Sequence, residues 1–165
     1  MPMISFRPYT KLKTFDWLLE AISLIIITLS WLYLLLNFVD IPETIPVHFN
    51  LYGEPDRFGD KSELLTVQYV GTALYVLLLV LGFFPQFHNI PTTLSVVNTN
   101  EKRMYSASML RSIKVIICLI FLVLSATSVY NALNGLQNQN PWLLFSLIGL
   151  LTAVIIYYWT KLAKK

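Results

Sequence analysis

Four long runs of apolar residues dominate the chain, and polar and charged residues collect between them. The runs cover residues 17–39, 64–84, 113–129 and 142–159. A helix crosses the roughly 30 Å hydrocarbon core of a bilayer in about 20 residues, and in that core each backbone N–H and C=O group must be paired within its own segment. The pattern therefore predicts an all-α integral membrane protein, built as a bundle of four transmembrane helices.

The composition supports this interpretation. Of the 165 residues, 56% are hydrophobic and 13% are charged, whereas a soluble domain has about 25% charged residues. A soluble fold of this size leaves much of its surface in water and needs charge to cover it. We therefore exclude a water-soluble globule, a disordered chain and a collagen-like fibre, and we interpret residues 1–165 as a single membrane domain.

The distribution of basic residues predicts the orientation in the membrane. Ten of the 12 Lys and Arg residues precede the first run, lie between the second run and the third or in the first two residues of the third, or follow the fourth. The other two are Arg57 and Lys61, in the first connection. By the positive-inside rule, both termini and the segment 86–112 face the cytoplasm, and the connection 40–61 faces outward. We expect the first run to be a retained anchor, because no small-residue cleavage site follows it.

Local signals predict where three helices begin. Asp60 with Glu63, and Asn98 with Glu101, have the spacing of capping boxes for the second and third helices. The third helix would then begin well before its apolar run and extend into the cytoplasm. The dipeptide at 140–141 is Asn-Pro, which is typical of an N-cap followed by the first helical residue.

The outward connection between the first two helices is long for a compact protein and keeps several apolar residues. Prolines near its start favour extended backbone, so we expect residues 45–50 to be extended and to alternate their side chains. Ile45, Val47 and Phe49 would share one face, and His48 and Asn50 the other. The connection is then either a structured cap, in which Arg57 pairs with a carboxylate at 54, 56 or 60, or a binding surface.

The same segment resembles a known family. Residues 45–61 read IPVHFNLYGEPDRFGDK, and the elements shared with the family motif are Pro46, His48, Asn50, Gly53, Pro55, Asp56, Gly59 and Lys61. The motif is similar to the signature loop of a bacterial family of membrane domains of unknown function, the SdpI-like immunity protein group. Asn100, Arg103 and Tyr105 also match short members before their third helix. The resemblance covers residues 15–125 and indicates a short four-helix member.

The resemblance implies a non-enzymatic protein of the bacterial cytoplasmic (inner) membrane that recognises a peptide or protein ligand, such as an antimicrobial toxin, through its outer loop. The expected partners are the lipid bilayer and that ligand or a partner membrane protein, with a homo-oligomer left open and no nucleic acid. The expected ligand-binding residues are His48, Phe49, Asn50, Tyr52, Gly53, Glu54, Pro55, Asp56, Arg57 and Lys61.

Other chemistry is less supported by the sequence. His48 with Glu54, Asp56 and Asp60 could bind a divalent metal, since imidazole and carboxylate oxygen suit zinc, but the spacing is irregular and we expect no metal and no other cofactor. A nucleophile–base pair is no better supported, and the sequence contains no glycine-rich phosphate loop and no HExxH or GxSxG motif. We therefore expect no catalytic residues and no enzymatic activity.

Two strong polar groups lie inside the apolar runs. Glu20 is about one turn inside the first run, where a charge must face protein or water. We expect an ion pair with Arg111 or Lys114 that holds the first helix against the third; the alternative is that Glu20 reaches the interface. Gln68 in the second run is expected to make a hydrogen bond between helices.

Alternatives to ligand recognition stay open at this point. The chain could be a small transporter, an accessory membrane subunit of a transport complex, or a structural membrane scaffold whose loop only caps the bundle. Basic residues at 102, 103 and 111 could also present a surface to anionic lipids or to a partner protein.

Overall fold

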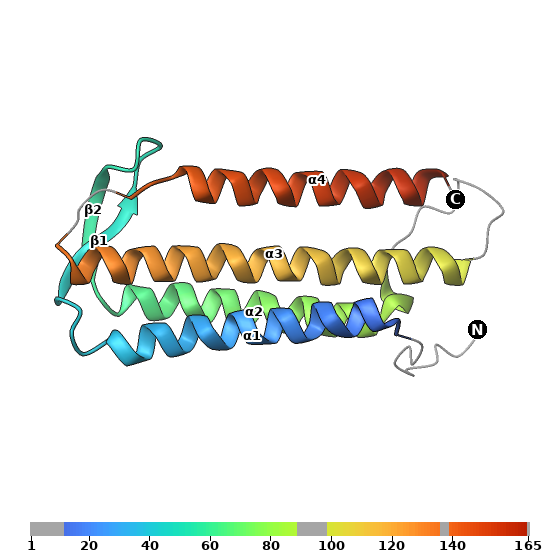
Figure 1. Ribbon diagram of the computed structural model, residues 1–165, viewed down its shortest axis with the longest axis horizontal. Helices are drawn as coiled ribbons and strands as arrows, with labels where there is room; N and C mark the ends of the chain where they lie inside the picture. Colours follow the sequence, from blue (N-terminus) through green and yellow to red (C-terminus); the bar gives the residue numbers. More distant parts are fainter. Residues whose placement is uncertain (1–11, 89–98, 136–138, 165) are drawn as a thin grey trace.

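The computed structural model describes residues 12–88, 99–135 and 139–164. This part of the chain forms four long helices, which are α1 (Thr14–Asn37), α2 (Glu63–Phe83), α3 (Thr99–Leu133) and α4 (Trp142–Lys164). Figure 1 shows them alongside one another, each running opposite to the one before it. All four are long and apolar enough to cross a membrane, which confirms the predicted bundle of a multi-pass membrane protein.

The two ends of the bundle differ. At the hairpin end, a pair of short β-strands covers the helices, and at the termini end α1 begins and α4 finishes (Figure 1). A single 3-10 turn, Pro85–Phe87, follows α2 at the termini end. The helix α3 has 35 residues, so it is about 52 Å long at 1.5 Å per residue. It extends past α1 and α2 at the termini end, as predicted for a helix that begins before its apolar run.

The helix boundaries partly follow the sequence signals. Asn140 Oδ1 accepts a hydrogen bond from the Trp142 amide at 3.0 Å, which confirms the predicted cap of α4. The predicted capping box of α2 is wrong, because the helix begins at Glu63 after Ser62 and no side-chain cap forms. Asp60 instead accepts from the Ser62 amide at 2.8 Å and shapes the turn that enters the helix. The corresponding signal for α3 involves residue 98, which lies outside the described residues.

The connection between α1 and α2 is a two-stranded antiparallel hairpin, formed by β1 (Thr44–Phe49) and β2 (Pro55–Asp60). We call residues 44–60 the hairpin. Its strand β1 is extended as predicted, with Ile45 1% exposed and His48 exposed on the other face. Ile45 packs into a core cluster with Ile41, Leu34 and residues of α2 and α3. Burial of this apolar face fixes the hairpin on the helix ends.

The helices α1, α2 and α3 form a three-helix unit, and α4 packs mainly on α3. In the three-helix unit, α1 and α2 each contact α3 extensively. The apolar span of α4 has no fully buried residue, and Figure 1 shows it set apart from α1 and α2. Lipid is as apolar as these side chains, so exposed apolar residues on α4 are compatible with a bilayer.

Candidate functional site

The base of the hairpin is tied to the helix ends by charged side chains. Lys61 Nζ donates to the Ile41 carbonyl at 3.3 Å and pairs with Glu43 at 3.0 Å. Arg57 makes two parallel hydrogen bonds to the Glu63 carboxylate, at 2.9 and 3.2 Å. The expected pairing of Arg57 with a carboxylate at 54, 56 or 60 is therefore wrong, because the first turn of α2 brings Glu63 opposite the guanidinium. Bidentate geometry of this kind fixes the orientation of both groups.

The tip of the hairpin is organised around Asn50. Its Oδ1 accepts from the amides of Tyr52 and Glu54, at 2.9 and 3.1 Å, and its Nδ2 donates to the Glu54 carboxylate at 3.0 Å. Glu54 is followed by Pro55, the first residue of β2. These bonds define the turn without using the side chains of Leu51 and Tyr52, and these two residues are 77% and 85% exposed. The tip therefore presents two large hydrophobic side chains on the surface of the protein.

Gly53 connects this tip to the segment before α4. The Gln139 amide donates to the Gly53 carbonyl at 2.8 Å, and Gln139 Nε2 donates to Thr127 Oγ1 on α3 at 2.5 Å. Gly53 has φ +83°, and a Cβ atom there would lie 1.8 Å from the Gln139 carbonyl oxygen. Glycine is required at this position both by the backbone conformation and by the close approach.

His48 and Asp56 pair across the two strands on the exposed face of the hairpin. The distance from His48 Nδ1 to Asp56 Oδ1 is 2.5 Å, and the two side chains are 64% and 45% exposed. Asp60 lies further along the same strand, and hydrogen bonds from the side chain and amide of Ser62 lower its pKa from the ordinary value. Within the described residues, no group of three or more His, Cys, Asp or Glu side chains is arranged to hold a metal ion.

A hollow of about 260 Å³ lies between the hairpin and the α3 and α4 helices. Phe49 and Asn50 belong to its hairpin wall, and Leu124 and Phe145 to its helical wall. The remaining lining residues are Val47, His48, Leu51, Gly53, Val123, Gln139, Asn140, Pro141 and Leu144. Of the expected binding residues, the structure gathers His48, Phe49, Asn50 and Gly53 around this hollow. The helical wall was not predicted, because its residues come from distant parts of the sequence.

A second polar region lies between α1 and α3, one to two turns inside the termini end. Glu20, which is 8% exposed, pairs with Arg111 Nε at 3.1 Å and with Lys114 Nζ. Arg111 also donates to the Gly82 carbonyl at 2.6 Å and lies 3.5 Å from Asp16. Two carboxylates thus face two cations, so the predicted ion pair between the first and third helices is confirmed. Buried charges in lipid require this kind of compensation.

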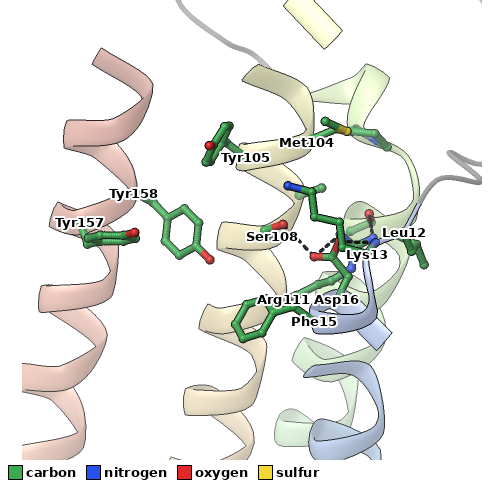
Figure 2. A pocket seen from close by; sticks show the side chains of 13 residues that line it. Leu12, Lys13, Phe15, Asp16, Met104, Tyr105, Ser108, Arg111, Tyr157 and Tyr158 are labelled. Atoms are coloured by element: carbon green, nitrogen blue, oxygen red, sulfur yellow. Dashed lines mark hydrogen bonds and ion pairs between the residues drawn. The ribbon is translucent and has the colours of Figure 1, made fainter. Parts of the chain in front are cut away.

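Asp16 and Arg111 of this cluster help to line a pocket of about 200 Å³ at the termini end. Figure 2 shows Asp16 of α1 and Ser108 of α3 joined by a hydrogen bond, with Tyr157 and Tyr158 approaching from α4. The Tyr158 hydroxyl lies 3.2 Å from Ser112 Oγ of α3. By their position near the end of an apolar run, these tyrosines are typical of membrane-interface residues. Their place beside the buried charges depends on the packing of α4 on α3.

The expected basic surface at residues 102, 103 and 111 is not formed as predicted. Lys102 is 4% exposed and Arg111 is 2% exposed, and only Arg103 is partly accessible. The guanidinium of Arg111 is used by the carboxylates of α1. Helix packing thus buries Lys102 and Arg111, so these two side chains are not accessible to lipid or to a partner protein.

His88 closes the termini end between α2 and α3. Its Nε2 donates to the Leu81 carbonyl at 2.9 Å, so in the neutral ring Nδ1 accepts from the Ser106 hydroxyl at 2.8 Å. Burial lowers the pKa of His88 from its ordinary value of 6.5, and the nearby Arg111 and Arg103 lower it further. The histidine is therefore adapted to its neutral form.

Gln68 lies deeper in the bundle and joins α2 to α1. Its Nε2 donates to Ser30 Oγ at 2.6 Å, which confirms the predicted hydrogen bond between helices. One turn away, Trp31 Nε1 donates to Thr72 Oγ1 at 2.9 Å. Polar side chains commonly join membrane helices by hydrogen bonds of this type.

Comparisons with known proteins agree with a membrane domain of unknown function. Residues 25–72 match the family described as Domain of unknown function (DUF1648). This stretch begins inside α1 and ends inside α2, so it contains the whole hairpin and the Trp31–Thr72 and Gln68–Ser30 hydrogen bonds. The match covers less than half of the chain.

One curated relative is an uncharacterized protein of Archaeoglobus fulgidus, which is 43% identical over 81 residues. The alignment covers 44% of this chain, and the chain spans 44% of the length of that relative. No solved structure matches the chain. The protein is therefore a multi-pass membrane protein with a segment similar to a domain of unknown function, and one curated relative is archaeal.

Proposed function

We propose that this membrane protein, without enzymatic activity, recognises a peptide or protein ligand through the hairpin. The observation that supports this most directly is the tip, where Leu51 and Tyr52 are 77% and 85% exposed. The backbone beneath them is held by Asn50 and by the contact of Gly53 with Gln139. A preordered loop loses little conformational entropy on binding, and large exposed apolar residues are typical of interaction sites.

The surroundings of the tip favour a cationic amphipathic ligand. Residues 40–63 contain six Asp and Glu residues and two basic residues, so this end of the protein attracts positive charge. The neighbouring hollow of about 260 Å³ has apolar walls that could receive a hydrophobic side chain. An antimicrobial peptide toxin fits this description, and the resemblance to the immunity family is a second reason to propose it.

We place the hairpin on the outer side of a bacterial-type cytoplasmic membrane and both termini in the cytoplasm. The support is the distribution of Lys and Arg along the sequence, because ten of the 12 lie before the first apolar run, between the second run and the third or in the first two residues of the third, or after the fourth. In this orientation the tip meets molecules that arrive from outside the cell.

The proposal is tested by survival of a sensitive bacterial strain that expresses the full chain and is exposed to a panel of cationic antimicrobial peptides. We expect the parent chain to increase survival against at least one peptide, and Leu51→Ser and Tyr52→Ser to abolish the gain at equal protein abundance. Tyr130→Ser is the matched control, because Tyr130 is 55% exposed but lies on α3. Equal survival with and without the gene contradicts immunity. If the tip variants lower only protein abundance, the loop is a structural cap.

A further inference from the structure

Three buried polar side chains, one from each helix of the three-helix unit, lie in the part of the bundle toward the hairpin end. Ser30 of α1 and Gln68 of α2 are 0% exposed, and Ser125 of α3 is 2% exposed. Gln68 Nε2 donates to Ser30 Oγ at 2.6 Å. Among the residues that the structure describes, the other two polar atoms, Gln68 Oε1 and Ser125 Oγ, have no hydrogen-bond partner.

Helix register places Gln68 and Ser125 at the same level and on facing sides. Gly71 of α2 lies against Phe121 of α3 so closely that a Cβ atom on Gly71 would be 2.7 Å from Phe121 Cγ. Gln68 is three residues before Gly71, and Ser125 is four residues after Phe121, so each shares a helix face with its contact residue. Because α2 and α3 run in opposite directions, both steps lead toward the hairpin end.

The hydroxyl of Ser125 lacks the hydrogen bond that several other helical Ser and Thr residues make within their own helix. Ser112, Thr127 and Thr152 each donate to the carbonyl four residues earlier, at 2.7 to 3.0 Å. This local bond is the usual way in which a helical hydroxyl is satisfied in lipid. Ser125 makes no such bond in the structure, so its hydroxyl is available to a partner outside its own helix.

We propose that one water molecule binds between α2 and α3 at this level, donating to Gln68 Oε1 and hydrogen-bonding to Ser125 Oγ. Leaving both groups unpaired in a bilayer would be costly, and a buried water is stable when it has two to four polar partners. With Gln68 Nε2 already bound to Ser30, the water makes the Gln68 amide the junction of all three helices.

The chemistry of the site favours water over a cation. The available groups are neutral oxygens, and no carboxylate is among them. The charged groups Glu20 and Lys114 pair with each other nearer the termini end. The apolar cluster of Ile26, Ile27 and Cys118 occupies the intervening part of the core. A cation would therefore carry an uncompensated charge into the membrane core, whereas water supplies the required donor and acceptor without charge.

The test uses the full chain in lipid bilayers with ¹⁵N-labelled glutamine and solid-state NMR that measures magnetisation transfer from water. We expect early transfer to the Gln68 side-chain amide in the parent chain. Ser125→Val fills the water position with methyl groups, so the transfer should fall severalfold. Ser146→Val is the control, because Ser146 lies on exposed α4 and donates to its own helix. No early transfer in the folded parent chain, or equal transfer in Ser125→Val, overturns the proposal.

A second measurement, the thermal unfolding midpoint, provides a test if the Ser125→Val variant folds poorly, and it also tests for a bound cation. Ser125→Ala should lower the unfolding midpoint of the parent chain, but it should change the midpoint less in a Gln68→Leu background, since the bridge is already lost there. Equal effects in both backgrounds contradict a shared water. The midpoint should be the same in sodium, potassium and N-methylglucamine salts. A midpoint that rises with one of the alkali ions overturns water in favour of a cation.

Discussion

The charges buried between α1 and α3 lead to a quantitative prediction about stability. Lys114 is 0% exposed, and its carboxylate partner is Glu20. Arg111 has further contacts with Asp16 and the Gly82 carbonyl. Substituting Glu20→Gln therefore leaves the buried Lys114 ammonium without a carboxylate partner, whereas Arg111 keeps its other contacts. Removing one partner of a buried ion pair costs about 3–5 kcal/mol of the free energy of unfolding.

This loss is measurable as a change in thermal unfolding of the detergent-solubilised protein. For a chain of this length, the expected fall in the unfolding midpoint of Glu20→Gln is roughly 6–20 °C. Adding Lys114→Met removes the uncompensated ammonium but keeps an apolar chain of similar length, so the double variant should recover more than half of the loss. Glu43→Gln is the matched control: this glutamate side chain is 79% exposed, and its pair with Lys61 should contribute little.

Two results would refute this reasoning. An unchanged midpoint in Glu20→Gln would show that the carboxylate does not compensate Lys114 in the folded protein. A double variant whose loss equals the sum of the losses of the two single variants would show that the two side chains act independently.

Three further predictions concern other parts of the molecule. Gly53→Ala should speed hydrogen exchange at the Gln139 amide, because the added Cβ collides with Gln139. Gly149→Ala meets no atom within 4 Å and should not change exchange there. His88 has a lowered pKa in the folded protein, so its contribution to stability is present above pH 6.5 and is lost as the pH falls toward the folded pKa. His88→Gln should therefore reduce the fall in the unfolding midpoint between about pH 7.5 and about pH 5.5. Equal pH profiles of the parent chain and the variant would contradict this. Tyr52→Cys should react with a membrane-impermeant maleimide in intact cells, and labelling only after lysis would reverse the proposed orientation.

Some site residues were predictable because the depth of a charged residue in the membrane restricts which other charged residues it can reach. Glu20 lies about one turn inside the first apolar run, and Arg111 and Lys114 lie on the part of α3 at the same end, so few other partners were within reach. The extended strand and the inward face at Ile45 also follow from local backbone preference and alternation. In these cases the sequence left few possible ion-pair partners and strand conformations, even without knowledge of the tertiary structure.

Other contacts required the folded chain. Arg57 had several nearby carboxylates of similar chemistry, and only the position of the first turn of α2 beside β2 brings Glu63 to the guanidinium. The contact of Gly53 with Gln139 joins segments far apart in the sequence. Nothing local to Ser125 indicates that its hydroxyl would lack the usual bond within the helix.

The sequence by itself determined the membrane class, the four helices and the strand that leaves α1, because in lipid each backbone group must be satisfied locally and apolar length decides which segments span. Tertiary structure alone decided which charges pair, where the tip of the hairpin docks and which polar atoms meet between α2 and α3. These choices depend on distances between segments, and the apolar pattern is the same on the lipid-facing and helix-facing sides of each span. A pattern that does not distinguish these sides can place helices in a membrane but cannot pack them.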